Sequence, residues 1–160
     1  MPMETPESDP RLALAYDESV RGWALQSSVL DELRSRAGVL LSAASVASAF
    51  LGALALEGTE EFSALSIAGT TAFGCVVLLC VYVLWPAKWT FVHNAELVIT
   101  TYVDKDKSLD QMRREMAIEN TTLRITNKGK LDHRFIGFQL ACLGLGIDVV
   151  LWLIDLGTKG

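Results

Sequence analysis

Three long apolar blocks limit what this chain can fold into. They cover residues 37–56, 63–85 and 135–154, and the only charged residue in any of them is Asp148. At a rise of about 1.5 Å per residue, a helix over each block is long enough to cross the roughly 30 Å of hydrocarbon in a bilayer. A soluble bundle can also bury helices that are apolar all round, but three such blocks in 160 residues leave too few polar faces for a water-soluble surface. We therefore predict an all-α integral membrane protein with three transmembrane helices.

The N-terminal part divides by composition into a tail and a helix. Residues 1–10 combine prolines with acids and are predicted to be a disordered tail, followed by a single membrane domain over 11–160. Residues 12–36 are predicted to form an amphipathic cytoplasmic helix that runs into the first span, because apolar residues recur along one side of it. These residues are Tyr16, Val20, Trp23, Leu30 and Leu33.

The segment 86–134 is predicted to hold two cytoplasmic helices. A short helix is expected from about Asn94 to Tyr102, and a longer one from Ser108 into the third span. Ser108 and Gln111 have the spacing of a capping box, in which each side chain accepts a hydrogen bond from the backbone of the other. The longer helix has an apolar face that we expect the N-terminal helix to cover. The residues of this face are Leu109, Met112, Met116 and Leu123.

The distribution of basic residues predicts the orientation in the membrane. Nine Lys or Arg residues fall within 88–134, and two arginines directly precede the first block, whereas the loop 57–62 carries three Glu and no base. The positive-inside rule therefore places the N-terminus in the cytoplasm and the C-terminus outside. Trp152, near the outer end of the third block, is expected to lie at the membrane interface.

Small residues recur at helical spacing in all three blocks, which lets neighbouring helices approach closely. Packing of the first two spans against each other as a hairpin accounts for any single pair of them. Together, however, these spans carry more small surface than one hairpin contact needs, so homo-oligomerisation is expected as well. The candidate packing residues are Ser42, Ser45, Ala49, Gly52, Ser66, Thr70, Gly74, Gly137, Ala141 and Gly144.

Asp148 and Gln139 are the candidate intramembrane polar residues. A carboxylate at the centre of a span costs about 2.5–3.5 kcal/mol on insertion scales, and no block carries a Lys or Arg to neutralise Asp148. Asp148 therefore either faces a wet cavity or is protonated and hydrogen-bonded to a Ser or Thr of a neighbouring span. A shallow side chain that snorkels to the outer headgroups is the third alternative. Gln139 points to the other side of the helix from a face that holds Gly137, Ala141, Gly144, Asp148 and Asp155.

The motifs that carry catalysis are missing, so an enzyme is not expected. The sequence has no Walker loop, dinucleotide fingerprint, zinc cluster or nucleophile elbow, and its three cysteines lie inside the blocks, so no metal or other cofactor is predicted. The basic run 105–130 has no aromatic residue, which argues against binding of a nucleic acid polymer. Arg113, Arg114 and Arg124 are candidates for holding a small phosphate ligand, with a solvated helix face as the alternative.

Several segments carry a family resemblance. They are Leu30–Leu41 leading into the first span, Trp85-Pro86 closing the second, the aromatic Trp89-Thr90-Phe91, the Glu96 to Tyr102 helix, and the long helix with Lys130 and Arg134 before the third span. In this order they resemble the small transmembrane effectors of bacterial anti-phage systems of the Pycsar type and, more loosely, the two-span SLATT effectors. The resemblance implies a bacterial inner-membrane protein that is activated by a cyclic nucleotide from a partner cyclase. Activated copies would then assemble and impair membrane integrity.

Three functions follow as hypotheses. The first is the oligomeric membrane effector, which contacts membrane lipid and is switched on by a cyclic nucleotide sensed by the cytoplasmic helices. The second is a constitutive ion channel or transporter subunit with Asp148 lining the pathway. The third is a non-catalytic membrane adaptor that recruits a soluble protein through the apolar face of the longer cytoplasmic helix.

Overall fold

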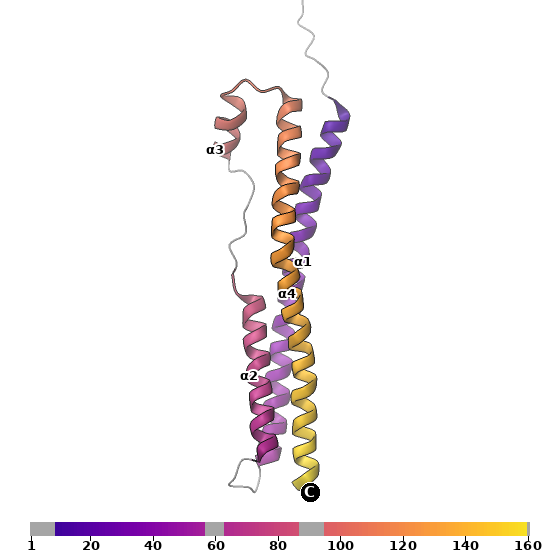
Figure 1. Cartoon of the computed structure of the whole chain (residues 1–160), viewed down its shortest axis with the longest axis vertical. Helices are drawn as coiled ribbons and strands as arrows, with labels where there is room; N and C mark the ends of the chain where they lie inside the picture. Colours follow the sequence, from indigo (N-terminus) through magenta and orange to yellow (C-terminus); the bar gives the residue numbers. More distant parts are fainter. Residues whose placement is uncertain (1–8, 57–62, 87–94, 160) are drawn as a thin grey trace, which may run out of the picture. The chain divides into compact units, whose positions relative to one another are not determined.

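The structure is a computed structural model that describes residues 9–56, 63–86 and 95–159. Every regular element in these ranges is helical (Figure 1), which confirms the predicted all-α fold. The first eight residues of the predicted tail, the loop 57–62 and Asn94 lie outside the described residues. The elements are α1 (Pro10–Leu56), α2 (Ala64–Leu84), α3 (Ala95–Val98), the π-helix η1 (Ile99–Val103) and α4 (Leu109–Lys159).

Three of the helices, α1, α2 and α4, are long and apolar enough to cross a membrane, as predicted. Both α1 and α4 also extend well beyond their apolar blocks, in agreement with the predicted helices that run into the first and third spans. The chain divides into two compact units. We call them the apolar unit, whose described residues are 30–56, 63–86 and 131–159, and the polar unit, whose described residues are 9–29 and 95–130.

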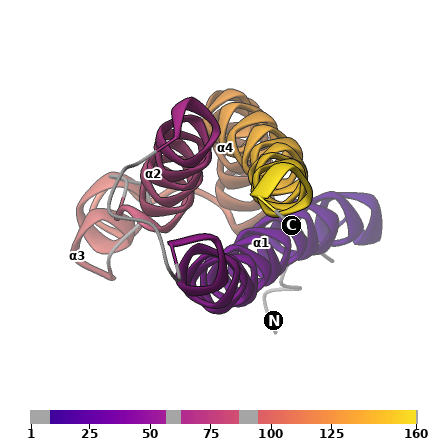
Figure 2. The same cartoon turned by 90° about the horizontal axis from the view of Figure 1, so that it is seen from below.

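The apolar unit is a bundle of α1, α2 and α4, whose ends are seen in Figure 2. Its interior is built mainly from small and medium side chains, so the three helices approach closely. Large apolar side chains lie on the outside instead, and Val46, Leu78 and Leu143 are 65–71% exposed. This arrangement suits contact with lipid, because hydrocarbon solvates such side chains as well as a protein interior does. Two buried clusters form the core, one of Leu33, Ala37 and Val83 and one of Ala44, Val76, Cys80 and Ala141.

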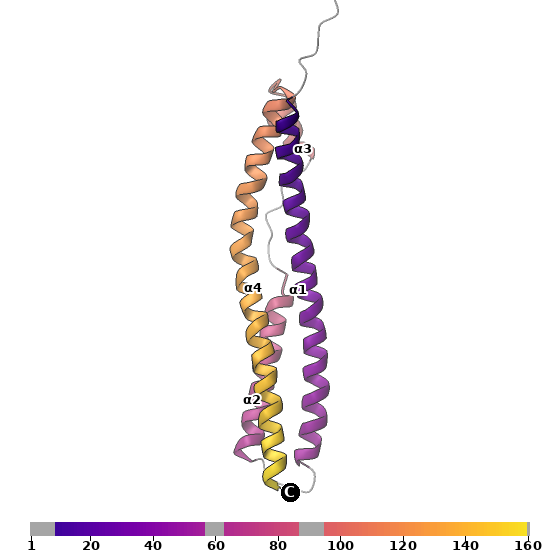
Figure 3. The ribbon, with the colours of Figure 1, turned by 90° about the vertical axis from the view of Figure 1, so that its right-hand side faces the viewer.

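In the polar unit, the first part of α1 and the first part of α4 lie side by side (Figures 1 and 3). Polar side chains join them along the contact. The Trp23 indole donates a hydrogen bond to the Asn120 carbonyl at 3.1 Å, and the Asn120 amide donates to the Ser19 hydroxyl at 2.9 Å. The Gln26 amide donates to the Arg124 carbonyl at 3.2 Å. The contact is therefore more polar than the predicted apolar face.

Two residues of the predicted apolar faces are exposed. Val20 is 44% exposed and Leu109 is 53% exposed, whereas Ser19 is buried. Adjacent residues of an α-helix point about 100° apart, so Ser19 and Val20 cannot both face α4. Ser19 takes the inner position because Asn120 supplies a hydrogen-bond partner for its hydroxyl, and the prediction for Val20 was wrong.

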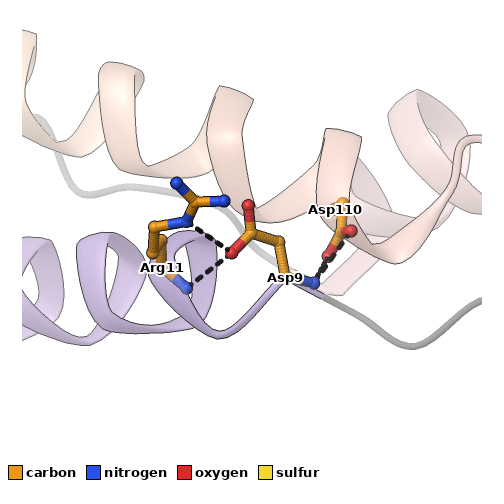
Figure 4. Close-up of polar contacts among 3 residues, drawn as sticks. All are labelled: Asp9, Arg11 and Asp110. Carbon is orange, nitrogen blue, oxygen red and sulfur yellow. Dashed lines mark hydrogen bonds and ion pairs between the residues drawn. The ribbon is translucent and has the colours of Figure 1, made fainter.

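The start of α1 is tied to the start of α4 by backbone capping (Figure 4). The Asp9 carboxylate accepts hydrogen bonds from the Arg11 backbone N–H at 2.9 Å and from its guanidinium at 3.2 Å. The backbone hydrogen bond, as the largest cause, holds the pKa of Asp9 below its usual value. The Asp9 backbone N–H in turn donates to both carboxylate oxygens of Asp110, at 3.2 and 3.1 Å.

Asp9 and Pro10 were included in the predicted disordered tail, and this was wrong. Asp9 is the N-cap of α1 and Pro10 is its first residue. Both residue types are favoured there, because an Asp side chain satisfies a free backbone N–H and proline has none to satisfy.

The segment before α4 also carries the predicted capping box. The Ser108 backbone N–H donates to the Gln111 side chain at 3.1 Å, and the Gln111 backbone N–H donates to the Ser108 hydroxyl at 3.3 Å. The predicted short helix continues as η1, whose Tyr102 is buried beneath the Lys107 ammonium, 5.1 Å from the ring centroid. Burial, followed by the negative charges of Glu119 and Glu115, raises the pKa of Tyr102.

Replacing Asn120 with Ala is expected to destabilise the polar unit by about 1 kcal/mol, because it removes the hydrogen bond to Ser19. Hydrogen exchange of the full chain in detergent, followed by mass spectrometry, should show faster exchange of the amides of residues 12–29. Thr121→Ala is the matched control, since Thr121 is exposed and its hydroxyl bonds back to the Ala117 carbonyl. Equal effects of the two substitutions would contradict the role assigned to Asn120.

Candidate functional site

The candidate site is the set of polar groups inside the apolar unit. Asp148, on α4, is completely buried, and the Ser48 hydroxyl of α1 donates a hydrogen bond of 2.5 Å to its Oδ2 atom. Among the described residues, no donor lies within hydrogen-bond distance of its Oδ1 atom. The contact with Ser48 matches the predicted alternative of a hydrogen bond to a neighbouring span. The snorkelling alternative is not what the structure shows, because the side chain has no exposed surface.

A second buried carboxyl lies two turns farther along α4. Asp155 accepts hydrogen bonds from the hydroxyls of Ser63 at 2.5 Å and Ser66 at 2.8 Å. Ser63 is also the N-cap of α2, where its hydroxyl accepts from the Ser66 backbone N–H at 3.0 Å. The two acids therefore bind α4 to both other helices of the bundle, Asp148 to α1 and Asp155 to α2.

Trp152 lies between these two acids and fills the space between α1 and α2. The residue is 4% exposed, so its indole packs inside the bundle instead of facing outward. A Cβ atom added at Gly52 would lie 3.5 Å from the ring, and one added at Gly69 would lie 3.0 Å from it. The Trp152 Nε1 atom has no hydrogen-bond partner among the described residues. Two glycines on facing helices thus make room for the largest side chain of the bundle.

The predicted small-residue pattern separates into two groups. Gly52, Ser66, Gly137, Ala141 and Gly144 lie at contacts within the chain. A Cβ atom at Gly137 would lie 3.2 Å from the Tyr82 ring, and one at Gly144 would lie 2.9 Å from the Val76 side chain. These residues therefore serve packing between the helices of a single copy.

The second group does not take part in this packing. Ser42, Ser45, Ala49 and Thr70 are exposed, and a Cβ atom at Gly74 would meet nothing within 4 Å. The hydroxyls of the first two bond to carbonyls four residues earlier in α1, and Thr70 does the same in α2. Gln139 is exposed as well, on the outer side of α4.

A groove of about 390 Å³ opens between α1 and α2. Trp152 of α4 lies at it, and the hydroxyl-bearing residues that line it include Ser48, which also binds Asp148. The groove therefore shares one lining residue, Ser48, with the hydrogen bond to the buried carboxyl. Its lining residues are Ser45, Ser48, Ala49, Gly52, Ala53, Thr70, Phe73 and Trp152.

Arg134 forms a separate polar contact, at the other end of α2. Its guanidinium donates to the Val83 carbonyl at 2.9 Å and to the Trp85 carbonyl at 2.6 Å, and the residue is only 5% exposed. A positive charge at this position favours the last carbonyls of a helix, which carry partial negative charge. Arg134 thereby holds the end of α2 against α4.

The structure does not bring the candidate phosphate-binding arginines together. Arg113 and Arg124 share one side of α4 but are separated by about 16 Å along its axis, at 1.5 Å per residue, and Arg114 points about 100° away from Arg113. The Arg124 guanidinium lies against Gly22 of α1, where an added Cβ atom would lie 2.2 Å from its Nη1 atom. Among the described residues, no three His, Cys, Asp or Glu side chains are grouped to hold a metal.

The sequence pattern pointed to part of this site. Asp148 was recognisable because it is the one charged residue in the apolar blocks, and the small residues were recognisable because they recur at helical spacing within these blocks. Asp155, Trp152 and Arg134 were not assigned to a site, since each lies near the end of a block where an aromatic or charged residue usually faces the membrane interface. Asp148 and Asp155 were predicted to share one helical face, and their seven-residue spacing was the signal that could have assigned Asp155 to the same buried site.

The chain matches no protein-family model, no curated protein and no solved structure.

Gly69→Ala is expected to destabilise the apolar unit by about 1–3 kcal/mol, because its Cβ would press on the buried Trp152 ring, which has little room to move. Thermal unfolding of the full chain in detergent, followed by circular dichroism, measures the change. Gly74→Ala on the same helix is the control. It meets nothing within 4 Å, so it should leave the stability unchanged or raise it. A stable Gly69→Ala variant would show that Trp152 is not confined as described.

Proposed function

We propose that this protein is a bacterial inner-membrane effector whose copies assemble and make the membrane permeable. The observation that carries the proposal is the groove between α1 and α2, which is lined by small and hydroxyl-bearing residues, among them Ser48, the hydrogen-bond donor to a buried carboxyl. The resemblance to small transmembrane effectors of anti-phage systems supports the same function. In this proposal the N-terminus lies in the cytoplasm and the C-terminus outside.

The groove supports assembly because it is shaped for close helix contact. In lipid, helices associate through packing of small residues and through hydrogen bonds rather than through a hydrophobic driving force. Ser45, Ala49 and Thr70 are exposed at the groove instead of packing within the chain. A helix of a second copy can approach such a surface more closely than it can approach the large side chains elsewhere on the bundle.

The buried acid supports permeabilisation. The Oδ1 atom of Asp148 has no partner among the described residues. Its Oδ2 atom accepts a hydrogen bond from Ser48, which lines the groove. If copies join through this groove, hydroxyls from each copy meet at the interface, and one of them, that of Ser48, also binds the buried carboxyl of its own copy. Polar groups gathered there give water and ions a path that lipid does not offer, which is why ionisable groups within spans mark such paths.

A cyclic nucleotide is the proposed trigger, sensed by the polar unit. The basis is the resemblance together with the basic residues of α4, of which Arg114 is exposed. Because α1 and α4 continue from the polar unit into the apolar blocks without a break, a ligand that shifts these helices would act on both spans. Arg113, Arg114 and Arg124 do not converge, so a phosphate would contact them singly.

Liposome leakage tests the proposal. The full chain is placed in liposomes loaded with a fluorescent dye, and each 3′,5′-cyclic mononucleotide is added in turn. Leakage that appears only with a nucleotide is the expected result. Leakage without any nucleotide, abolished by Asp148→Asn, would instead support the constitutive channel. Intact liposomes under every condition would contradict both and leave the adaptor, whose exposed Leu109 would then be tested for recruitment of a soluble protein.

Ala49→Phe is expected to lower both assembly and leakage at least severalfold, because a large side chain at the groove keeps a second copy away. Cross-linking in liposomes and dye release measure the two effects. Leu143→Phe is the matched control, since Leu143 is exposed on α4 and does not line the groove. If both variants assemble and leak like the unaltered protein, the groove is not the interface.

A further inference from the structure

The end of the apolar unit opposite Asp155 carries two arginines, which differ in how completely their N–H groups are hydrogen-bonded. Arg134 is almost fully buried and gives hydrogen bonds to the Val83 and Trp85 carbonyls. Arg34, on α1, is half-buried, and its Nε atom is buried with no hydrogen-bond partner among the described residues. An N–H of a charged group is costly to leave unpaired, so this arginine is incompletely satisfied by the chain.

The two arginines lie at the same level of the bundle. Leu33, next to Arg34, packs in one cluster with Val83, whose carbonyl Arg134 binds. Leu131 and Phe138, on either side of Arg134 in α4, pack against the same cluster. The positive charge of Arg34 is near enough to act on that of Arg134. Two like charges held together in this way favour an anion beside them.

Arg34 forms a loose ion pair with an exposed acid one turn earlier in α1. The Asp31 carboxylate lies 3.8 Å from the Arg34 Nη1 atom, beyond hydrogen-bond distance, and its side chain is 70% exposed. By contrast, Arg36 on the same helix forms a direct ion pair with Glu32 at 2.5 Å, with both side chains about 60% exposed. Arg34 therefore has a looser ion pair than Arg36, and its Nε atom has no acceptor among the described residues.

The position of the pair indicates where that acceptor comes from. Arg134 binds the carbonyl of Trp85, which follows the last residue of α2, and Trp85 and Tyr82 are both at least half exposed. Exposed Trp and Tyr at the end of a span lie at the level of the lipid headgroups. Phosphate oxygens are abundant at that level, and guanidinium groups bind them with paired, charge-assisted hydrogen bonds.

We propose that Arg34, supported by the charge of Arg134, binds the phosphate of an anionic phospholipid at this end of the apolar unit. Arg34 is the residue that contacts the lipid, and Arg134 is a positioning residue because its donors already hold the end of α2. The site needs neither assembly of copies nor a nucleotide, so it stands independently of the function proposed above.

Native mass spectrometry of the full chain tests this site. The protein is purified in detergent and mixed with phosphatidylglycerol and phosphatidylcholine that have identical acyl chains. The unaltered protein should retain phosphatidylglycerol in preference. Arg34→Gln should reduce the retained phosphatidylglycerol about tenfold, the effect of losing one charge-assisted contact. Arg36→Gln, which removes the same charge from an exposed and already paired position, should keep the preference.

Three further results would decide against the proposal. Equal lipid retention by Arg34→Gln and Arg36→Gln would show that general surface charge is responsible. Equal retention of the two lipids by the unaltered protein would show that no anionic headgroup is recognised. Thermal stabilisation by inorganic phosphate alone, equal to that by phosphatidylglycerol, would assign the site to a soluble phosphate instead.

Circular dichroism checks the fold of each variant, and Arg34→Lys, which retains a single point charge, should show intermediate retention if Arg34→Gln does not fold.

Discussion

Two carboxyl groups inside an apolar bundle need hydrogen-bond donors, and the arrangement of the apolar unit follows from where those donors are. Asp148 finds its donor on α1 and Asp155 finds two on α2. Helices in lipid gain little from burying apolar surface against each other, so directional bonds and close packing decide how they meet. A turn of α4 by one residue, about 100°, would move both acids out of the bundle. The pair therefore fixes the rotation of α4, and the depth of α4 along its neighbours follows from the same bonds.

The remaining features of the unit are consistent with that rotation. With the acids facing inward, Trp152 also faces inward, and Gly52 and Gly69 provide the space for its ring. The space that Trp152 leaves unfilled opens outward as the groove, next to small residues that no helix of the same chain covers. At the opposite end, Arg134 fixes the last turn of α2. Each end of the bundle thus has its own polar anchor, and the proposed assembly and lipid sites depend on different ones.

The features that could be predicted from the sequence are those encoded by local pattern. The three spans follow from composition, and the capping box at Ser108 follows from spacing alone. The features that could not be predicted depend on a partner distant in the sequence. Ser19 displaces Val20 from the contact because Asn120, about a hundred residues away, binds it. In the sequence Trp152 has the position of an interfacial anchor, but in the structure its ring packs against Gly69 inside the bundle. Arg124 has the pattern of an isolated basic residue, but in the structure its guanidinium lies against Gly22 of α1.

The exposed hydroxyls on α1 and α2 affect how well a single copy is tolerated by the surrounding lipid. Ser42, Ser45, Thr70 and Thr71 each donate to a carbonyl of their own helix, four residues earlier. A hydroxyl that faces lipid without a partner would be unfavourable, but these are already satisfied before any second helix arrives. A single copy can therefore expose these four hydroxyls to lipid, and they add no polar penalty that would by itself drive association.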